Sequence, residues 1–146
     1  VYVQGAGRSR SKLTAGFRDA GNGVLFGTDS FWTGVDVPGP SLSQVILVRL
    51  PFENPNHPVA EARAEWIQRR GGNAFTDLVL PEAILKFRQG LGRLIRNNTD
   101  SGYLVVLDPR AVLREYGHAF LSMLPHGNYR RFCIDDIPGC YEPRPK

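Results

Sequence analysis

Apolar and polar positions alternate along the chain in two patterns: short apolar runs, typical of strands, and amphipathic segments, typical of helices. The apolar runs predict strands at residues 1–5, 23–28, 43–52 and 102–110. The run 43–52 is the strongest, because continuous β-branched and apolar residues are typical of a strand buried on both faces. Strands separated by helices predict an α/β domain built on a mostly parallel sheet flanked by helices.

Four helices are expected between and after these strands. One covers residues 11–20 and is closed by Gly21, and a second begins near Pro58 and ends at the glycines that follow residues 69–70. Pro81 begins a third helix, since proline suits the first turn of a helix and glycine its exit. A short fourth helix is expected at residues 116–124, and residues 125–146, rich in Pro, Gly and charge, predict a C-terminal extension of the same domain.

The helix that begins at Pro81 separates into two faces at about 100° per residue. The apolar face predicts the core side and contains Ala83, Ile84, Phe87, Leu91, Leu94 and Ile95. The opposite face carries Gln89, Arg93 and Arg96, one helical turn apart, together with Glu82 and Lys86. Such a face is either a solvated surface or an anion site. Gly90 and Gly92 each cost roughly 1 kcal/mol relative to Ala in a helix, which indicates that a close backbone approach is needed.

A second polar group follows the predicted strand 23–28. Thr28, Asp29 and Ser30 come directly after it, and ligands of parallel sheets gather at the carboxyl ends of strands. Hydroxyl groups and backbone N–H groups beside glycines suit phosphate oxygens. The alternative is a loop of caps and turns with Phe31 and Trp32 packed inward, and spacing alone favours this alternative.

Composition changes this picture in a few respects. With 146 residues, 42% hydrophobic and 22% charged, the chain is expected to form one domain. A run of eighteen apolar residues and a signal-like start are both missing, so neither a membrane span nor secretion is indicated. The net charge of +4 permits a nucleic-acid partner. Cys133 and Cys140 have no CxxC or His spacing suited to zinc, which predicts reduced thiols in a cytoplasmic protein and no metal site.

Two segments carry a resemblance to a known family. "FGTDSFWTGVDVPG", residues 26–39, and "LPEAILKFRQGLGRLIRNNTDSGYLVVLDPR", residues 80–110, resemble motifs V and VI of superfamily 2 helicases of the DinG/XPD branch. The QxxGRxxR pattern in this context is highly specific. The resemblance implies the second RecA-like (P-loop NTPase-like) domain, which agrees with the α/β prediction. Residues 1–146 would be this helicase C-terminal domain without its first strand, with 125–146 as its extension.

The resemblance also implies which anion the basic helix face meets. In this family the motif VI arginines face ATP that is held mainly by the first RecA-like domain, across the cleft between the two domains. Arg96 would be the arginine finger and Arg93 its partner, both stabilising charge that develops during phosphoryl transfer. Gln89 would position the nucleotide or the attacking water.

The same resemblance implies a division of roles in motif V. Asp36 and Gly34 would couple the nucleotide side to the nucleic-acid side, while the residues after the strand would contact the nucleic-acid backbone. A basic loop near the start of the chain would add to these contacts, although a solvated loop is nearly as good an interpretation. The nucleic-acid set is Thr28, Asp29, Ser30, Arg8, Arg10 and Lys12. Thr33 stands where the family usually has Glu, which leaves the coupling through motif V open.

Several parts of a complete motor are missing from the sequence. The GxxxxGK[ST] pattern, an acidic DEAH-type box and a four-cysteine iron–sulfur set do not occur. ATP and Mg²⁺ would therefore be held mainly by the N-terminal RecA-like domain of the same protein, and this chain would carry no iron–sulfur cluster. The expected function is the C-terminal motor domain of an ATP-dependent DNA helicase that binds single-stranded DNA, inactive when isolated. The alternative is a non-catalytic nucleic-acid-binding or regulatory module, against which the intact Gln89, Arg93 and Arg96 argue.

Overall fold

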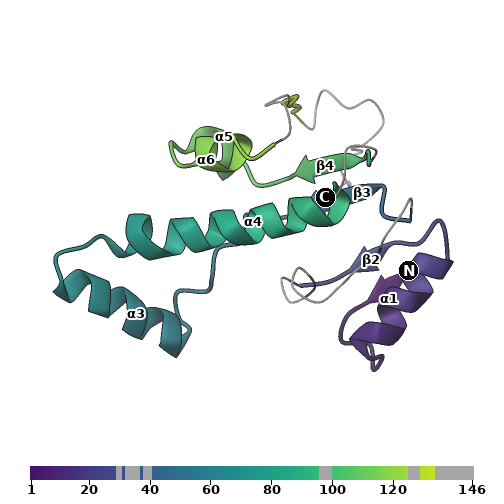
Figure 1. Cartoon of the computed structure of the whole chain (residues 1–146), viewed down its shortest axis with the longest axis horizontal. Helices are drawn as coiled ribbons and strands as arrows, with labels where there is room; N and C mark the ends of the chain where they lie inside the picture. Colours follow the sequence, from purple (N-terminus) through teal and green to yellow (C-terminus); the bar gives the residue numbers. More distant parts are fainter. Residues whose placement is uncertain (29–30, 32–36, 38–40, 96–99, 125–128, 134–146) are drawn as a thin grey trace, which may run out of the picture.

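A computed structural model describes residues 1–28, 31, 37, 41–95, 100–124 and 129–133 (Figure 1). The first half contains the strand β1 (Tyr2–Val3), the helix α1 (Arg10–Asp19) and the strands β2 (Leu25–Phe26) and β3 (Gln44–Leu47). The second half contains α3 (Pro58–Arg69), the π-helical turn η1 (Phe75–Val79), α4 (Leu80–Leu94), β4 (Tyr103–Val106), α5 (Arg110–Leu113) and α6 (Gly117–Leu121).

The strands form two parallel pairs. β1 pairs with β2, with Tyr2 opposite Leu25, and β3 pairs with β4, with Gln44 opposite Tyr103. A parallel pair needs a crossover connection, which α1 supplies for the first pair and the segment from α3 to α4 supplies for the second. Parallel strands joined by helices confirm the predicted α/β class, although each strand is shorter than its apolar run.

The local signals for helix ends are confirmed. Pro58 begins α3, and the chain leaves that helix through Gly71, whose φ of 79° is one that residues with a side chain rarely adopt. Gly21, with a φ of 66°, follows α1 in the same way. Both helices therefore end where glycine allows the backbone to turn.

The start of the third predicted helix differs from expectation, because a π-helical turn precedes Pro81. The Asn73 side chain accepts hydrogen bonds from the N–H groups of Phe75 (2.9 Å) and Thr76 (3.3 Å), and Asp77 accepts one from the Asn73 N–H (2.8 Å). These bonds satisfy N–H groups at the start of η1. The helical run therefore begins at Phe75, ahead of the start that Pro81 predicts.

Pro81 gives a physical reason for the π-helical turn. Proline has no N–H to donate within a helix, and its ring would clash with the carbonyl of the residue four positions earlier, here Asp77. The wider turn η1 contains Asp77 and ends just before α4, so it accommodates the ring while the helical run continues.

The core lies between α4, the β3–β4 pair and the helices α5 and α6. Phe87 and Phe120 are 1% and 0% exposed, with ring centroids 5.4 Å apart in an edge-to-face arrangement. Ala83 and Leu94 on the same side of α4 are 1% and 5% exposed, which confirms the predicted apolar face. The cluster comprises Leu47, Leu50, Ala83, Phe87, Ala111 and Phe120.

The prediction that the strand within 43–52 is buried on both faces is wrong for one face. Leu47 is 6% exposed, whereas its neighbours Ile46 and Val48 are 54% and 68% exposed. Successive side chains of a strand point to opposite faces, and α4 packs on the face that carries Leu47. Tyr103 of β4 is also 76% exposed, so an apolar face of this pair remains accessible.

Candidate functional site

The motif V segment, residues 26–39, begins at the carboxyl end of β2, where Gln4 holds it. The Gln4 side-chain oxygen Oε1 accepts hydrogen bonds from the Thr28 N–H (2.8 Å) and from the Thr28 hydroxyl (3.0 Å). The Gln4 N–H donates to the Phe26 carbonyl (3.0 Å), which continues the pairing of β1 with β2. Thr28 is exposed, at the edge where the sequence predicted a ligand site. Gln4 was not among the predicted site residues.

Phe31 anchors the same segment from the inside. Its side chain is 9% exposed, and its N–H donates to the Thr28 carbonyl (2.9 Å). The guanidinium of Arg10 lies 5.6 Å from the centre of the Phe31 ring, within the range of a cation–π contact. The structure therefore brings the basic loop and the motif V segment together, and it confirms that Phe31 packs inward.

The three cations predicted for a basic loop, Arg8, Arg10 and Lys12, are all exposed, but only Arg8 lies in a loop, because Arg10 and Lys12 belong to the first turn of α1. Gly7, Arg8, Ser9 and Lys12 line a hollow of about 570 Å³ just before and within the first turn of α1. Gly7 has a φ of 75°, which turns the chain into this loop. Cations, a hydroxyl and the N-terminal end of a helix surround the hollow, and all of these favour an anion.

Two of the predicted motif VI residues, Gln89 and Arg93, lie in the last turns of α4. Gln89 is exposed and Arg93 is half-buried, on the side away from Ala83 and Phe87. The two glycines differ, since Gly90 is buried whereas a side chain at Gly92 would meet open space. The expectation of a close backbone approach therefore finds no support at Gly92.

The predicted helix ends earlier than expected, and Arg96, which was predicted to share it with Arg93, lies outside the described residues. α4 ends at Leu94, and Ile95 has an extended backbone with φ −118° and ψ 106°. Glycine and β-branched residues have low helix propensity, which weakens the end of this helix. The described part of the helix therefore carries Gln89 and Arg93.

The last turn of α4 lies at the amino ends of β3 and β4, as the antiparallel course of α4 and β4 in Figure 1 also shows. A Cβ atom added to Gly102 would come within 2.6 Å of the Leu94 side chain and 2.7 Å of the Ser43 carbonyl oxygen. This glycine permits the close approach. Motif VI thus lies at the opposite end of its strand pair from the position that the carboxyl-end rule predicts for ligands.

Asp108 and Arg110 form a polar cluster at the carboxyl end of β4. Asp108 is 6% exposed and accepts hydrogen bonds from the Leu50 N–H (2.8 Å) and the Arg110 N–H (3.0 Å). The Arg110 guanidinium contacts both carboxylate oxygens, at distances of 2.6–3.0 Å. The hydrogen bond from Arg110 lowers the pKa of Asp108 to about 2. The same pairing raises the pKa of Arg110.

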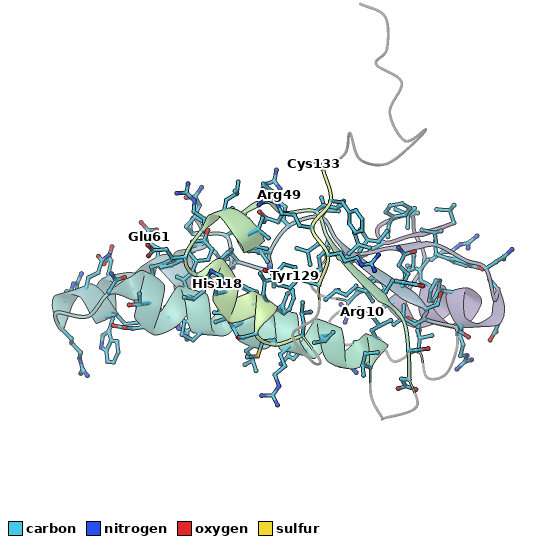
Figure 2. All side chains as sticks on the ribbon, turned by 90° about the horizontal axis from the view of Figure 1, so that it is seen from above. Arg10, Arg49, Glu61, His118, Tyr129 and Cys133 are labelled. Atoms are coloured by element: carbon cyan, nitrogen blue, oxygen red, sulfur yellow. The ribbon has the colours of Figure 1, made fainter. Side chains whose placement is uncertain are left out.

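The sequence analysis did not identify this cluster, although an acidic residue within the predicted apolar strand 102–110 was a signal for it. The Arg110 guanidinium also lies 5.2 Å from the centre of the Phe52 ring, which joins the cluster to the core. Arg49, near the carboxyl end of β3, instead projects away from the ribbon (Figure 2). Asp108 and Arg110 therefore hold strand ends together, whereas Arg49 faces solvent.

Several predicted site residues lie outside the described part of the chain. They are Asp29, Ser30, Gly34, Asp36 and Arg96, together with Thr33 and Cys140. Among the residues that the structure describes, no group of His, Cys, Asp or Glu could hold a metal ion. No helix in the same part of the chain combines the length and apolar character needed to cross a membrane.

The structure has parallel strands joined by helices, and polar residues of both motifs lie near the strand ends. A comparison of the sequence with known protein families gives a consistent assignment. The chain belongs to the helicase C-terminal domain family, whose model matches residues 1–127. The predicted relationship to DinG-type helicases is therefore confirmed, and the family's RecA-like fold agrees with the predicted fold class.

Individual relatives support the same assignment. The chain is 47% identical to the ATP-dependent DNA helicase YoaA of Escherichia coli over 125 residues, which are 86% of this chain and 20% of the relative. It is 45% identical to the Bacillus subtilis protein named 3'-5' exonuclease DinG over 126 residues, 86% of this chain and 14% of the relative. The ATP-dependent helicase DinG of Mycobacterium tuberculosis is 44% identical over 117 residues, which are 80% of this chain and 18% of the relative. The chain thus spans a fifth or less of these relatives.

Proposed function

We propose that the chain is the C-terminal motor domain of an ATP-dependent DNA helicase. In this proposal it supplies an arginine finger to ATP bound by the N-terminal RecA-like domain of the same protein, and it contacts single-stranded DNA through motif V. The relatives named as ATP-dependent helicases support this function. The full-length protein would act in the cytoplasm.

The observation that carries the proposal is the division of α4 into two faces. Ala83 and Phe87 are buried against the strands, while Gln89 is exposed and Arg93 is half-buried on the other side. A polar, cationic surface at the end of a well-packed helix suits a group that acts on a phosphate held by another domain. Arginine is appropriate there because its planar fork can bind phosphate oxygens in a bidentate manner.

Each remaining site residue has a role in this proposal. Arg96 is the finger, Arg93 its partner and Gln89 the group that positions nucleotide or water. Asp36 and Gly34 couple ATP to nucleic acid. Backbone phosphates are contacted by Thr28, Asp29, Ser30, Arg8, Arg10 and Lys12. The first domain would bind most of the ATP and the Mg²⁺, and the metal ion would neutralise charge on the phosphates.

The experiment that tests the proposal is the substitution Arg96→Ala in the full-length protein. ATP turnover at saturating ATP and DNA should fall on the order of 10³-fold or more, since an arginine finger stabilises charge in the transition state. Arg96→Lys should recover little of the lost rate, because it keeps the charge but loses the bidentate fork. Single-strand binding should change little.

Arg69→Ala is the matched control. Arg69 is 79% exposed and pairs across one helical turn with Glu65 (3.0 Å), so its loss should cost almost nothing. Equal turnover by Arg96→Ala and Arg69→Ala would show that Arg96 is a solvated surface residue. The non-catalytic module would then be the better interpretation.

A further inference from the structure

Gln4 belongs to neither helicase motif, yet its side chain accepts two hydrogen bonds from Thr28, which lies within the motif V segment. We propose that Gln4 is a positioning residue for nucleic-acid binding, acting through Thr28. The inference rests on the proposed function, in which the motif V segment contacts single-stranded DNA.

The geometry at Thr28 supports this role. One oxygen of Gln4 accepts both the N–H and the hydroxyl of Thr28, at 2.8 Å and 3.0 Å. Two donors directed at one acceptor restrain the peptide plane and the χ1 angle of Thr28 together. Gln4 is itself restrained, because its N–H donates to the Phe26 carbonyl (3.0 Å). The end of β1 therefore sets the direction in which the chain leaves β2.

The restraint extends further along the segment. The Thr28 carbonyl accepts the N–H of the buried Phe31 (2.9 Å), and the Arg10 guanidinium lies over the Phe31 ring at 5.6 Å. A shift of Thr28 would therefore move both a buried anchor and a cation of the basic loop. Gln4 carries no charge, so its contribution to DNA binding comes from geometry.

A competing role for Gln4 predicts an opposite result. The two Thr28 donors that a phosphate oxygen could use are directed at the Gln4 oxygen. If Gln4 competed with phosphate for them, removing its oxygen would strengthen DNA binding. If Gln4 positions Thr28, the same change weakens binding.

The test uses Gln4→Met in the full-length protein, because methionine has a similar shape but is only a weak acceptor. The concentration of oligo(dT) that gives half-maximal stimulation of ATP turnover should rise roughly three- to tenfold, as expected for lost hydrogen bonds. Turnover without DNA and the melting temperature should stay near those of the wild type. An unchanged or lower half-maximal concentration would overturn the proposal.

Ser41→Ala is the matched control. It removes another exposed hydrogen bond between distant parts of the chain, from the Ser41 hydroxyl to the Arg18 carbonyl (3.2 Å), without touching Thr28. The half-maximal DNA concentration should not change. A rise as large as that in Gln4→Met would mean that the effect is general loosening of the fold, and would overturn the positioning role.

A double-mutant cycle tests whether Gln4 acts through Thr28. The combination of Gln4→Met with Thr28→Val should raise the half-maximal concentration by less than the product of the two single effects. Independent effects would contradict the proposal.

Ser30→Ala distinguishes a failure of the proposed motif V function from a failure of the positioning role. If Ser30→Ala and Thr28→Val both have no effect, the proposed function of motif V fails. If they weaken binding and Gln4→Met does not, only the positioning role of Gln4 fails.

Discussion

Asp108 links residues that are far apart in the sequence through a single carboxylate. It is 58 residues from Leu50, whose N–H it accepts at 2.8 Å. Arg110 is 41% exposed at its side chain whereas Asp108 is 4% exposed, so the carboxylate is the more strongly desolvated partner. A buried carboxylate is stable in the charged form only when several donors surround it. The backbone and guanidinium donors around Asp108 meet this need.

The low pKa of Asp108 predicts a loss of stability in acid. Because the pKa is about 2 in the folded chain instead of 3.8, the charged group stabilises the fold by about 2 kcal/mol at neutral pH. This contribution is present above pH 3.8 and disappears as the pH falls through about 2. Urea unfolding at pH 7 and at acid pH should show this loss in the wild type and a smaller one in Asp108→Asn, which is already less stable at pH 7.

The exposed pair Glu65–Arg69 supplies the control for this prediction. Glu65→Gln removes a carboxylate whose side chain is 53% exposed, and such pairs contribute little. Its unfolding free energy should follow the wild-type pH dependence. If Asp108→Asn also does so, the ion pair with Arg110 does not stabilise the fold in the way described.

Single residues differed in how well the sequence predicted them. The faces of Gln89 and Phe87 followed from helical periodicity, which depends on a few neighbouring residues. The hydrogen bonds of Gln4 and Asp108 depend on which strands become neighbours, and that is decided by contacts across 24 and 58 residues. A local pattern could therefore identify the polar face of α4 but could not pair Gln4 with Thr28.

At the scale of helices and strands, the prolines and glycines gave the most reliable predictions. Pro58 and Gly71 bound α3 because each restricts or releases φ through its own covalent structure. The burial of a strand face depends instead on what packs against it. This is why the exposure of Ile46 was missed, and why the end of α4 at Leu94 was missed as well.

The contact between α5 and α6 predicts that Gly117 cannot be replaced. A Cβ atom at this position would lie 2.6 Å from the Ala111 carbonyl carbon and 2.7 Å from the Arg110 carbonyl oxygen. Both are backbone atoms, which cannot move without displacing α5. Gly117→Ala should therefore lower the free energy of unfolding by about 2–3 kcal/mol, measured by urea denaturation.

Gly92→Ala is the control for this effect. A Cβ atom there would meet no atom within 4 Å, and alanine favours a helix over glycine by roughly 1 kcal/mol. This variant should be at least as stable as the wild type. Similar losses in the two variants would mean that backbone overlap is not the cause.

At the scale of the whole molecule, the chain should bind DNA without turning over ATP. Its net charge is +4, Arg8, Arg10 and Lys12 are exposed, and Arg10 contacts Phe31 of the motif V segment. If these three cations each displace a counterion from single-stranded DNA, the logarithm of the affinity should fall with the logarithm of salt with a slope of about −2. A salt series with oligo(dT) measures this slope.

Alanine at all three positions should flatten the slope, whereas alanine at the exposed residues Arg18, Arg69 and Arg114 should not. ATP turnover by the isolated chain should remain at background with or without DNA, because the sequence lacks the pattern that holds the triphosphate. DNA-stimulated turnover by this chain alone would contradict the proposed division of work between two domains.

The pairing of β3 with β4 has a consequence for how the chain is made. Leu50 comes off the ribosome 58 residues ahead of Asp108, its partner at the end of β4. At about 5–20 residues per second, β3 waits roughly 3–12 s for that partner. During this interval the apolar side chains of β3, including Leu47, which is only 6% exposed in the folded chain, are available to other nascent chains. Slowing translation between these two strands should therefore increase aggregation, and a chaperone that binds short apolar strands should reduce it.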